Sequence, residues 1–555
     1  INNISFDFNI NNKQYLLENS QIEYEKLKLS SKKIKINDKN QYFLFEGDVS
    51  SPKSLVNSNL LTVIFKNNLE NIGINNVNFG SENNFSFRLE KKFKISNFKI
   101  NSKIDLQKLT YKKRSNSLKK YISSYNDSVE LIDHKIELLI SKNKLLIKGN
   151  GNFLINEKID KINYEVKSND DKYNFKSQIE LNNIPLQIKL LNYTKKESKN
   201  ALLNIEGSYK KNQNIYFKNI LLKEFKNSFK VNGLSLSQNY KVNSIEEIYL
   251  DFLNDNEKKN KVLFKRNKKN YELSGKIFDG TNLVNQILES DNEGNVFDFL
   301  NDFNSVVKIS LNKIFIDDIN YLNNLNGNLK FNKSSLKNLD LKANFSDNKS
   351  LTFTVKTDQN NQKITTLFSE YAKPLVKKYK FIKGFEEGYL DFYSVKKNNI
   401  SSSNLKINDF KLNELPALTK ILTLASLQGI ADLLTGEGIR FNEFEMKFRN
   451  EKKLMTIDEI YAIGPAISIM MDGYVQKDEL ISLRGTLVPA TTLNKIIGSL
   501  PLLGDILVGK KTGEGVFGVS FKIKGPPKKT KTTVNPIKTL TPRFITRTLE
   551  KIKKN

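Results

Sequence analysis

The 555-residue chain contains no cysteine, no tryptophan and a single histidine, His134. Without cysteine it cannot form a disulfide framework or a thiolate metal site. One histidine leaves little room for a catalytic triad and rules out a multi-histidine metal centre. We therefore expect no catalytic residues, no metal and no cofactor, and we predict that the protein is not an enzyme.

Long hydrophobic runs are also missing. No stretch of about 18 uninterrupted apolar residues occurs, so no membrane-spanning helix is predicted. The apolar share of 38% is low for a globular protein. Such a share with regular alternation suits a thin, one-sided sheet better than a thick core. Because the chain begins at Ile1 rather than at methionine, we expect an N-terminal signal or anchor to be absent from it.

Acidic residues are fewer than basic ones: 89 Lys and Arg against 60 Asp and Glu leave a net charge of +29. An excess of this size can indicate nucleic acid or an anionic membrane as a partner. The lysines are dispersed, however, and no nucleic-acid motif accompanies them. We predict solvent-facing lysines and no nucleic-acid binding.

Two glycine motifs have the spacing of nucleotide-binding signatures but not their context. Gly513, Gly515 and Gly518 lead into the strand-like VFGVSFKIKG, whereas the dinucleotide fingerprint needs a helix there. Near Gly509, Lys511 stands where a P-loop requires Ser or Thr. Neither motif predicts a cofactor.

Alternation of apolar and polar residues dominates from the start to about residue 400. Phe85, Phe87 and Leu89 are typical, and Asn, Gly, Asp and Lys clusters separate such runs at intervals of about 10–12 residues. The pattern predicts a mostly β fold. We expect an elongated, curled antiparallel sheet that forms a hydrophobic, taco-like groove, with a few short helices and a helical cap near the C-terminus.

A loose repeat places a glycine between two short alternating runs. It occurs in 145–155 and around Gly207, Gly275, Gly327 and Gly473. A glycine inside a strand pattern indicates a bulge or bend. We therefore predict that the sheet curves at these positions.

Three regions are predicted along the chain. A repetitive β-sheet region covers 1–400, a C-terminal domain covers 401–536, and a basic tail covers 537–555. Changes in periodicity predict further segments: a basic helix or loop near 107–127, a helix and loop near 281–303, a short helix over 371–380, and capping helices near 417–434 and 491–507.

The C-terminal block resembles the AsmA-like family of Gram-negative envelope proteins, in particular its large YhdP-like branch with the AsmA-like C-terminal domain. The clear match covers about 370–545. Its residues are Leu415, Pro416, Leu418, Ala425, Ser426, Gly429, Gly436, Gly438, Ile439, Phe441, Gly464, Pro465, Gly473, Gly485, Thr486, Val488, Pro489, Asn494, Pro501–Gly504, Gly513–Gly518, Gly525, Pro526 and Val534–Pro536. Upstream, Gly388, Tyr389 and Leu390 look like the family's Gly-Gly-x-Leu strand, with Glu387 in place of its first glycine.

The resemblance implies a periplasmic protein, anchored to the inner membrane by an N-terminal helix that this chain does not contain. It also implies phospholipid movement toward the outer membrane along a hydrophobic groove that binds acyl chains. Envelope protein partners stay unidentified. The alternative is a structural or assembly factor for outer-membrane proteins that does not conduct lipid.

The predicted site is a set of apolar residues rather than a catalytic centre. The groove candidates are Leu329, Phe331, Leu339, Leu341, Phe345, Phe353 and Val355. The residues expected to form the C-terminal cap are Leu418, Leu422, Ala425, Ile496, Leu500 and Leu503. Acyl chains could cover such a face without any directional contact.

Overall fold

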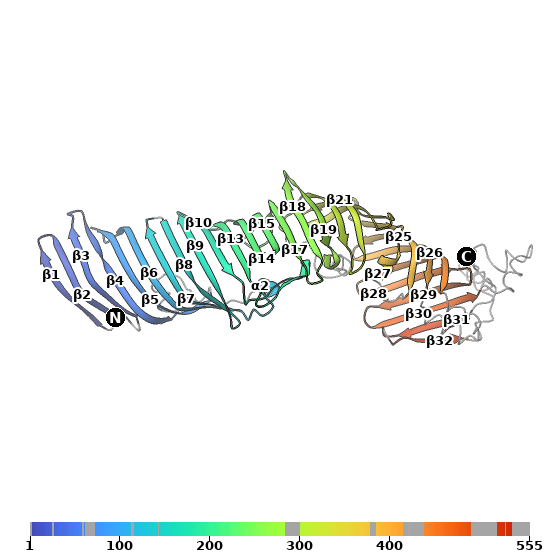
Figure 1. Cartoon of the computed structure of the whole chain (residues 1–555), viewed down its shortest axis with the longest axis horizontal. Helices are drawn as coiled ribbons and strands as arrows, with labels where there is room; N and C mark the ends of the chain where they lie inside the picture. The colour runs from blue at the N-terminus through green and yellow to red at the C-terminus, as the bar shows by residue number, and fades with distance from the viewer. Residues whose placement is uncertain are drawn as a thin grey trace, which may run out of the picture. The chain divides into compact units, whose positions relative to one another are not determined.

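The computed structural model describes residues 3–24, 27–57, 60, 73–112, 116–142, 144–283, 300–377, 384–413, 421, 438–489, 519–527 and 529–535. Within these ranges the fold is mostly β, as predicted, with long antiparallel strands and a few short helices (Figure 1). Among the helices that the structure describes, none combines the length and the hydropathy that a membrane-spanning segment requires.

The chain divides into two compact units. Unit 1 comprises 1–286 with 297–303, and unit 2 comprises 287–296 with 304–555. The boundary predicted at 400/401 falls inside unit 2. There, β25 (Phe385–Lys397) and β26 (Ile400–Leu412) form an antiparallel pair. Lys397 lies opposite Ile400 at the turn, and Phe385 lies opposite Leu412 at the far end. The backbone ladder therefore runs on through the predicted boundary.

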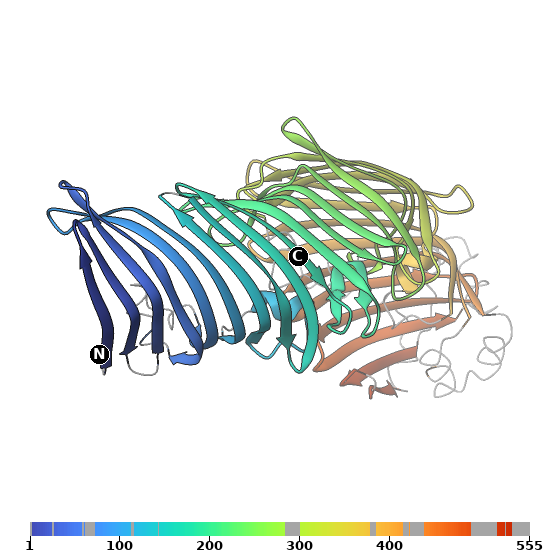
Figure 2. The ribbon, with the colours of Figure 1, turned by 60° about the vertical axis from the view of Figure 1, so that its left-hand side comes forward.

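Unit 1 is a meander in which each strand pairs with the next along the chain. Its strands bend along their length, from the blue strands through to the green ones (Figure 2). Its main strands are β1 (Asn3–Asn11), β2 (Gln14–Tyr24), β3 (Leu27–Asp38), β4 (Tyr42–Asn57), β5 (Ile74–Glu90), β6 (Ile95–Lys112), β7 (Ser128–Ser141), β8 (Lys144–Ile155), β9 (Lys158–Asn169), β10 (Lys172–Glu180), β13 (Ala201–Lys210), β14 (Ile215–Glu224), β15 (Asn227–Leu236), β17 (Glu247–Leu253), β18 (Lys259–Asn267) and β19 (Asn270–Asp279).

Shorter elements interrupt this meander. They are the helix α2 (Asn116–Tyr121), the hairpin of β11 (Leu186–Ile188) and β12 (Tyr193–Lys195) with η2 (Lys189–Leu191) between them, and β16 (Val242–Ser244). The hairpin forms a separate two-stranded sheet between β10 and β13, which pair directly with each other. It is an insertion that leaves the main ladder continuous.

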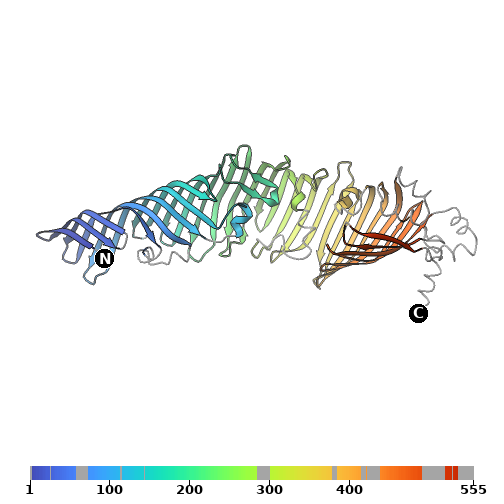
Figure 3. The same ribbon diagram turned by 90° about the horizontal axis from the view of Figure 1, so that it is seen from below.

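In unit 2 as well, strands that follow each other along the chain lie side by side, as the yellow to red strands of Figure 3 show. Its elements are β20 (Val306–Phe315), β21 (Tyr321–Asn332), β22 (Ser335–Asn344), β23 (Ser350–Thr357), β24 (Lys363–Ser369), α4 (Lys373–Lys377), β25 (Phe385–Lys397), β26 (Ile400–Leu412), β27 (Ile439–Glu451), β28 (Leu454–Ile463), β29 (Ile467–Gln476), β30 (Leu480–Pro489), β31 (Val519–Gly525) and β32 (Lys531–Asn535). Successive strands from β20 to β24 and from β25 to β32 pair antiparallel, and β24 pairs with β25 across α4.

Some predicted interruptions lie elsewhere. The basic helix or loop expected near 107–127 is wrong for its first part, because 107–112 complete strand β6 and only 116–121 form a helix. A register shift lies between Leu106 and Lys108, so Leu106 and the pair Leu109 and Tyr111 do not follow one regular alternation. The sequence pattern therefore did not reveal this strand. The helix expected over 371–380 is present as α4 over 373–377. The segment near 281–303 lies largely outside the described residues.

The glycine prediction is confirmed at several positions. The strand register changes between Glu206 and Gly207. It also changes at Val262, the partner of Gly275, and at Ile457, the partner of Gly473. Gly151 faces the bulge in β7 between Ile132 and Lys135. An extra residue in one strand increases the local bend. These bulges therefore lie where the sequence pattern placed them.

Candidate functional site

The predicted groove residues of unit 2 share one face of the sheet. Leu329 pairs with Leu339, which pairs with Val355, and Leu341 pairs with Phe353. Because side chains alternate along a strand, these cross-strand partners point the same way. The structure thus brings together residues that the sequence pattern singled out strand by strand.

Their exposure differs, however. Phe331, Leu339, Phe345 and Val355 are buried. Leu329, Leu341 and Phe353 are only half-buried and keep part of their surface free. The first group is therefore core, and only the second group offers apolar surface to another molecule.

A half-buried apolar row continues from this second group across the sheet. From Phe353 it passes through directly paired residues on β24 to β27, namely Leu367, Phe392, Leu405 and Met446. Sequence reasoning missed this continuation. In β24, Ile364 and Phe368 face the other way, so apolar residues occur on both faces and the alternation is not visible.

One side of the same face is closed by a core cluster. Its buried residues are Ala372, Val376, Phe385, Leu390, Ile407, Phe410, Ile421, Ile439, Phe441, Ala462, Ile467, Leu487, Val519 and Phe521. Ile421 comes from the segment predicted as the first capping helix. The six predicted cap residues themselves lie outside the described residues. Leu367 and Phe392 pack against the cluster while remaining half-buried.

Unit 1 presents a second apolar face with the same character. A row of paired, half-buried residues crosses it from β6 to β19: Ile104, Ile136, Tyr164, Ile205, Ile220, Val231, Ile248, Phe264 and Leu273, with Gly149 and Ser177 between them. No residue of this row was singled out from the sequence. At each bulge the apolar face changes between even-numbered and odd-numbered residues. The alternation of apolar and polar residues along the chain is therefore broken and hard to recognise.

Part of this face is covered by the β11–β12 hairpin and the segment after α2. Ile184, Tyr193, Ile122 and Tyr125 pack with strand residues such as Phe252 in one buried cluster. The strand residues of this cluster lie at or near the ends of β8, β10, β13, β14, β15 and β17. The middle row from Ile104 to Leu273 does not belong to it.

Buried polar groups hold this hairpin. The Asp160 carboxylate accepts backbone N–H bonds from Asn182 at 3.0 Å, Asn183 at 3.0 Å and Ile184 at 2.9 Å. The Lys195 ammonium, which is fully buried, donates to the carbonyls of Asn182 at 2.8 Å and Ile184 at 3.0 Å. Burial lowers the pKa of Lys195, and the charge of Asp160 opposes that shift. These bonds fix the covering segment in place.

A histidine and a tyrosine also lie on the apolar side. His134 is fully buried in the β7 bulge, and its Nε2 lies 2.9 Å from the Asn152 carbonyl oxygen. A carbonyl can only accept, so Nε2 carries the proton and Nδ1 accepts from the Tyr164 hydroxyl. Burial lowers the pKa of His134 and raises that of Tyr164. This pair is neutral and internally satisfied.

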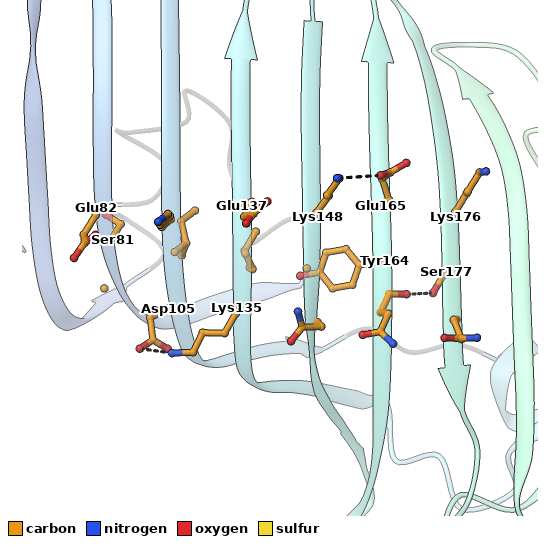
Figure 4. Close-up of a pocket in the computed structure, with 18 of the residues that line it drawn as sticks. Ser81, Glu82, Asp105, Lys135, Glu137, Lys148, Tyr164, Glu165, Lys176 and Ser177 are labelled. Carbon is orange, nitrogen blue, oxygen red and sulfur yellow. Dashed lines mark hydrogen bonds and ion pairs between the residues drawn. The ribbon is translucent and has the colours of Figure 1, made fainter.

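The opposite face of unit 1 is charged. Acid and base alternate along one cross-strand row of Glu82, Lys103, Glu137, Lys148, Glu165, Lys176 and Glu206. A second row on this face carries Asp105, Lys135, Asn150, Asn163, Gln178 and Asn204. The two rows and the backbone between them line an open trough of about 1390 Å³ (Figure 4).

The charges of this trough neutralise one another. Lys135 lies 2.9 Å from Asp105, and Lys148 lies 3.8 Å from Glu165 (Figure 4). Hydrogen bonds from Lys135 and Lys53 lower the pKa of Asp105, and one from Lys167 lowers that of Glu165. Because water screens exposed pairs of this kind, each contributes little to the free energy of folding. Their role is to specify strand register, since a slipped strand would place like charges opposite each other.

No protein-family model matches the chain, and no characterised protein matches its sequence. Nowhere in the described parts of the chain do three or more His, Asp or Glu side chains gather as they would around a metal ion. The arrangement to be explained is therefore two units, each of whose strands present a polar face and a partly open apolar face.

Proposed function

We propose that the chain is a non-enzymatic phospholipid carrier of the cell envelope, acting between the inner and outer membranes and moving lipid toward the outer one. The half-buried apolar rows bind the acyl chains, and the headgroup stays in water. The observation that carries this proposal is the uninterrupted row from Leu341 through Phe353, Leu367, Phe392 and Leu405, which keeps apolar surface exposed on consecutive strands.

The contacts between acyl chains and such a surface are additive and non-directional. Each methylene that leaves water for such a surface contributes about 0.8 kcal/mol. Consecutive strands along the row each present a half-buried apolar side chain, so an acyl chain that moves by one strand exchanges one set of contacts for a similar set. A ligand can then slide without a strong barrier and without chemistry by the protein.

The resemblance of 370–545 to AsmA-like envelope proteins agrees with this proposal and supplies its location, the periplasm. The charged face of unit 1 supports it too, because a sheet with one polar and one apolar face can stay in water while it holds a lipid on the apolar side. The residues that would hold lipid lie on strands rather than in a closed pocket, which suits passage better than storage.

Site-specific photocrosslinking tests the proposal. A photoreactive residue at Leu367 should capture phospholipid in a lipid extract, and the same residue at Phe368 should not. The two positions are neighbours on β24, and Phe368 is itself apolar and 42% exposed but faces the other side. Equal capture at both positions would contradict the proposal. Capture of unfolded outer-membrane protein instead of lipid at Leu367 would favour the assembly-factor alternative.

A further inference from the structure

Two lysines stand on the apolar side of unit 2. Lys363 begins β24 and pairs directly with Lys396 near the end of β25. Lys363 has the same parity as Leu367, and Lys396 has the same parity as Phe392. Since side chains alternate along a strand, both ammonium groups lie on the face that carries the half-buried apolar row.

Nothing in the described residues neutralises them. Neither lysine has a carboxylate within ion-pair distance there, whereas outward-facing lysines of the same sheet do: Lys406 lies 3.7 Å from Glu445 and Lys447 lies 3.8 Å from Glu459. On their own face, the side chains nearest to the pair in the ladder are hydroxyls and an amide: Thr357, Thr365, Ser394, Ser401 and Asn450. Beyond Thr357 the next residue of that parity is a third lysine, Lys337, whose carbonyl accepts a hydrogen bond from the Thr357 hydroxyl at 2.8 Å.

The arrangement is unfavourable without a ligand. Directly opposed residues on antiparallel strands have their Cβ atoms about 4.5–5.5 Å apart, and like charges there repel. Both side chains are half-buried. Burial, and then the charge of Lys396, lowers the pKa of Lys363. An anion between the two ammonium groups would remove both costs.

We propose that Lys363 and Lys396 form a binding site for the phosphate of a phospholipid headgroup, at the edge of the apolar row that holds the tails. The inference rests on the proposed function and adds headgroup selection to it. Lys363 and Leu367 are separated by about 13 Å of strand. Thr365 and Ser394 fill that interval, where the glycerol and ester oxygens of a lipid would lie. As a lipid passes this point, its phosphate lies between the two ammonium groups while its tails contact Leu367 and Phe392.

The site favours anionic lipid. Hydrogen bonds between charged groups are stronger than those between neutral groups. The full chain should therefore bind fluorescent phosphatidylglycerol at least about tenfold more tightly than diacylglycerol with the same acyl chains. The double variant Lys363→Gln with Lys396→Gln should bind phosphatidylglycerol no better than diacylglycerol, and its diacylglycerol binding should be unchanged.

Two further variants sharpen the test. Lys363→Arg with Lys396→Arg keeps both charges and should keep the preference. Lys356→Gln with Lys397→Gln removes the same charge from exposed, outward-facing positions on β23 and β25, and should also keep the preference. Removing opposed like charges should not unfold the sheet, which an unchanged or higher thermal midpoint of the double glutamine variant would verify.

The outcomes separate the two proposals. If the wild-type chain binds neither lipid, the proposed function is wrong. If it binds both lipids and the glutamine pair leaves their affinity ratio unchanged, the carrier proposal stands and the headgroup site is wrong. Inorganic phosphate alone serves as the third probe. Binding of it as tight as that of phosphatidylglycerol, lost in the glutamine pair, would show a free-anion site and overturn the lipid assignment.

Discussion

Nδ1 of His134 lies 3.2 Å from the hydroxyl oxygen of Tyr164, on the apolar side of unit 1. The contact joins the bulged strand β7 to β9 across β8, and the tyrosine ring passes over Gly149 on its way. The only histidine of the chain is thus a packing residue in a bend of the sheet. Its position links a titratable group to the local stability of the sheet.

Acid should loosen this part of unit 1. Burial holds the pKa of His134 below the ordinary value of 6.5, so between the two pKa values the unfolded chain binds more protons than the folded one. Stability is therefore lost as the pH falls below about 6.5, by at most about 1.4 kcal/mol per pH unit. Hydrogen exchange of β7 and β8, corrected for intrinsic rates, should be faster at pH 5 than at pH 8.

The variant His134→Gln is the control for this pH dependence. Its amide does not titrate but can still accept from the Tyr164 hydroxyl and donate to the Asn152 carbonyl. Its exchange should change less between the two pH values than that of the wild type. The same change in both proteins would show that other groups cause the effect.

Gly149→Ala should destabilise unit 1. A Cβ at this position would lie 2.3 Å from Cζ of Tyr164, whose ring is held by the His134 contact. Overpacking of this kind costs about 1–3 kcal/mol. Denaturant unfolding should show the loss. In a Tyr164→Ala background the same substitution should cost much less, and Asn150→Ala on the exposed face should cost little.

Asp160→Asn should release the β11–β12 hairpin without unfolding the main sheet. The substituted amide has one acceptor oxygen for the backbone N–H groups of Asn182, Asn183 and Ile184, and an unsatisfied buried donor costs about 1–3 kcal/mol. Hydrogen exchange should accelerate in 182–195 and stay unchanged in β5 and β6. The matched control is Asp171→Asn in an exposed turn. Equal acceleration with both variants would contradict the anchoring role of Asp160.

Lys148→Glu should weaken the charged row of unit 1. The new carboxylate would face Glu137 on one side and Glu165 on the other. We expect a loss of about 0.5–1 kcal/mol at low salt, and a smaller one at about 1 M salt because exposed charges are screened. Lys144→Glu, opposite Ser141 and Asn169, carries the same charge change and should be nearly neutral. A salt-independent loss would mean that packing, not charge, is responsible.

Leu367→Asp should reduce lipid binding by the full chain at least about tenfold. An isolated carboxylate on the apolar row must either lose water or exclude the acyl chain. Phe368→Asp places the same group on the other face of β24 and should leave lipid binding unchanged. Measured with the same fluorescent lipids, equal affinities of the two variants would argue against the apolar row as the binding surface.

The β character of the chain could be read from its sequence because period-two alternation is a local property. Leu339 and Leu341 show it plainly, and the structure pairs them with Val355 and Phe353. The glycine repeat was equally informative, since Gly207 and Gly275 lie beside register shifts. Both signals depend only on neighbours along the strand.

The site was less predictable. Phe331 and Leu339 are as apolar as Leu341, yet they are buried while Leu341 keeps free surface. How much of a row stays open depends on what packs against it, and Val376 of α4 and Ile421 belong to the cluster that packs against Leu367 and Phe392. The strand β24 was hidden for the opposite reason, because Phe368 places an apolar side chain on the outer face.

The amino-acid sequence by itself determined that the protein consists of strands with one apolar and one charged face, because alternation is a local property that does not depend on distant residues. Tertiary structure alone decided which strands lie next to each other and where an insertion covers the oily side. It also decided that Lys363 lies opposite Lys396, where no carboxylate of the described residues is close enough to form an ion pair with either lysine. The reason is that register is a relation between two strands, and a shift of one residue reverses every side chain that it carries.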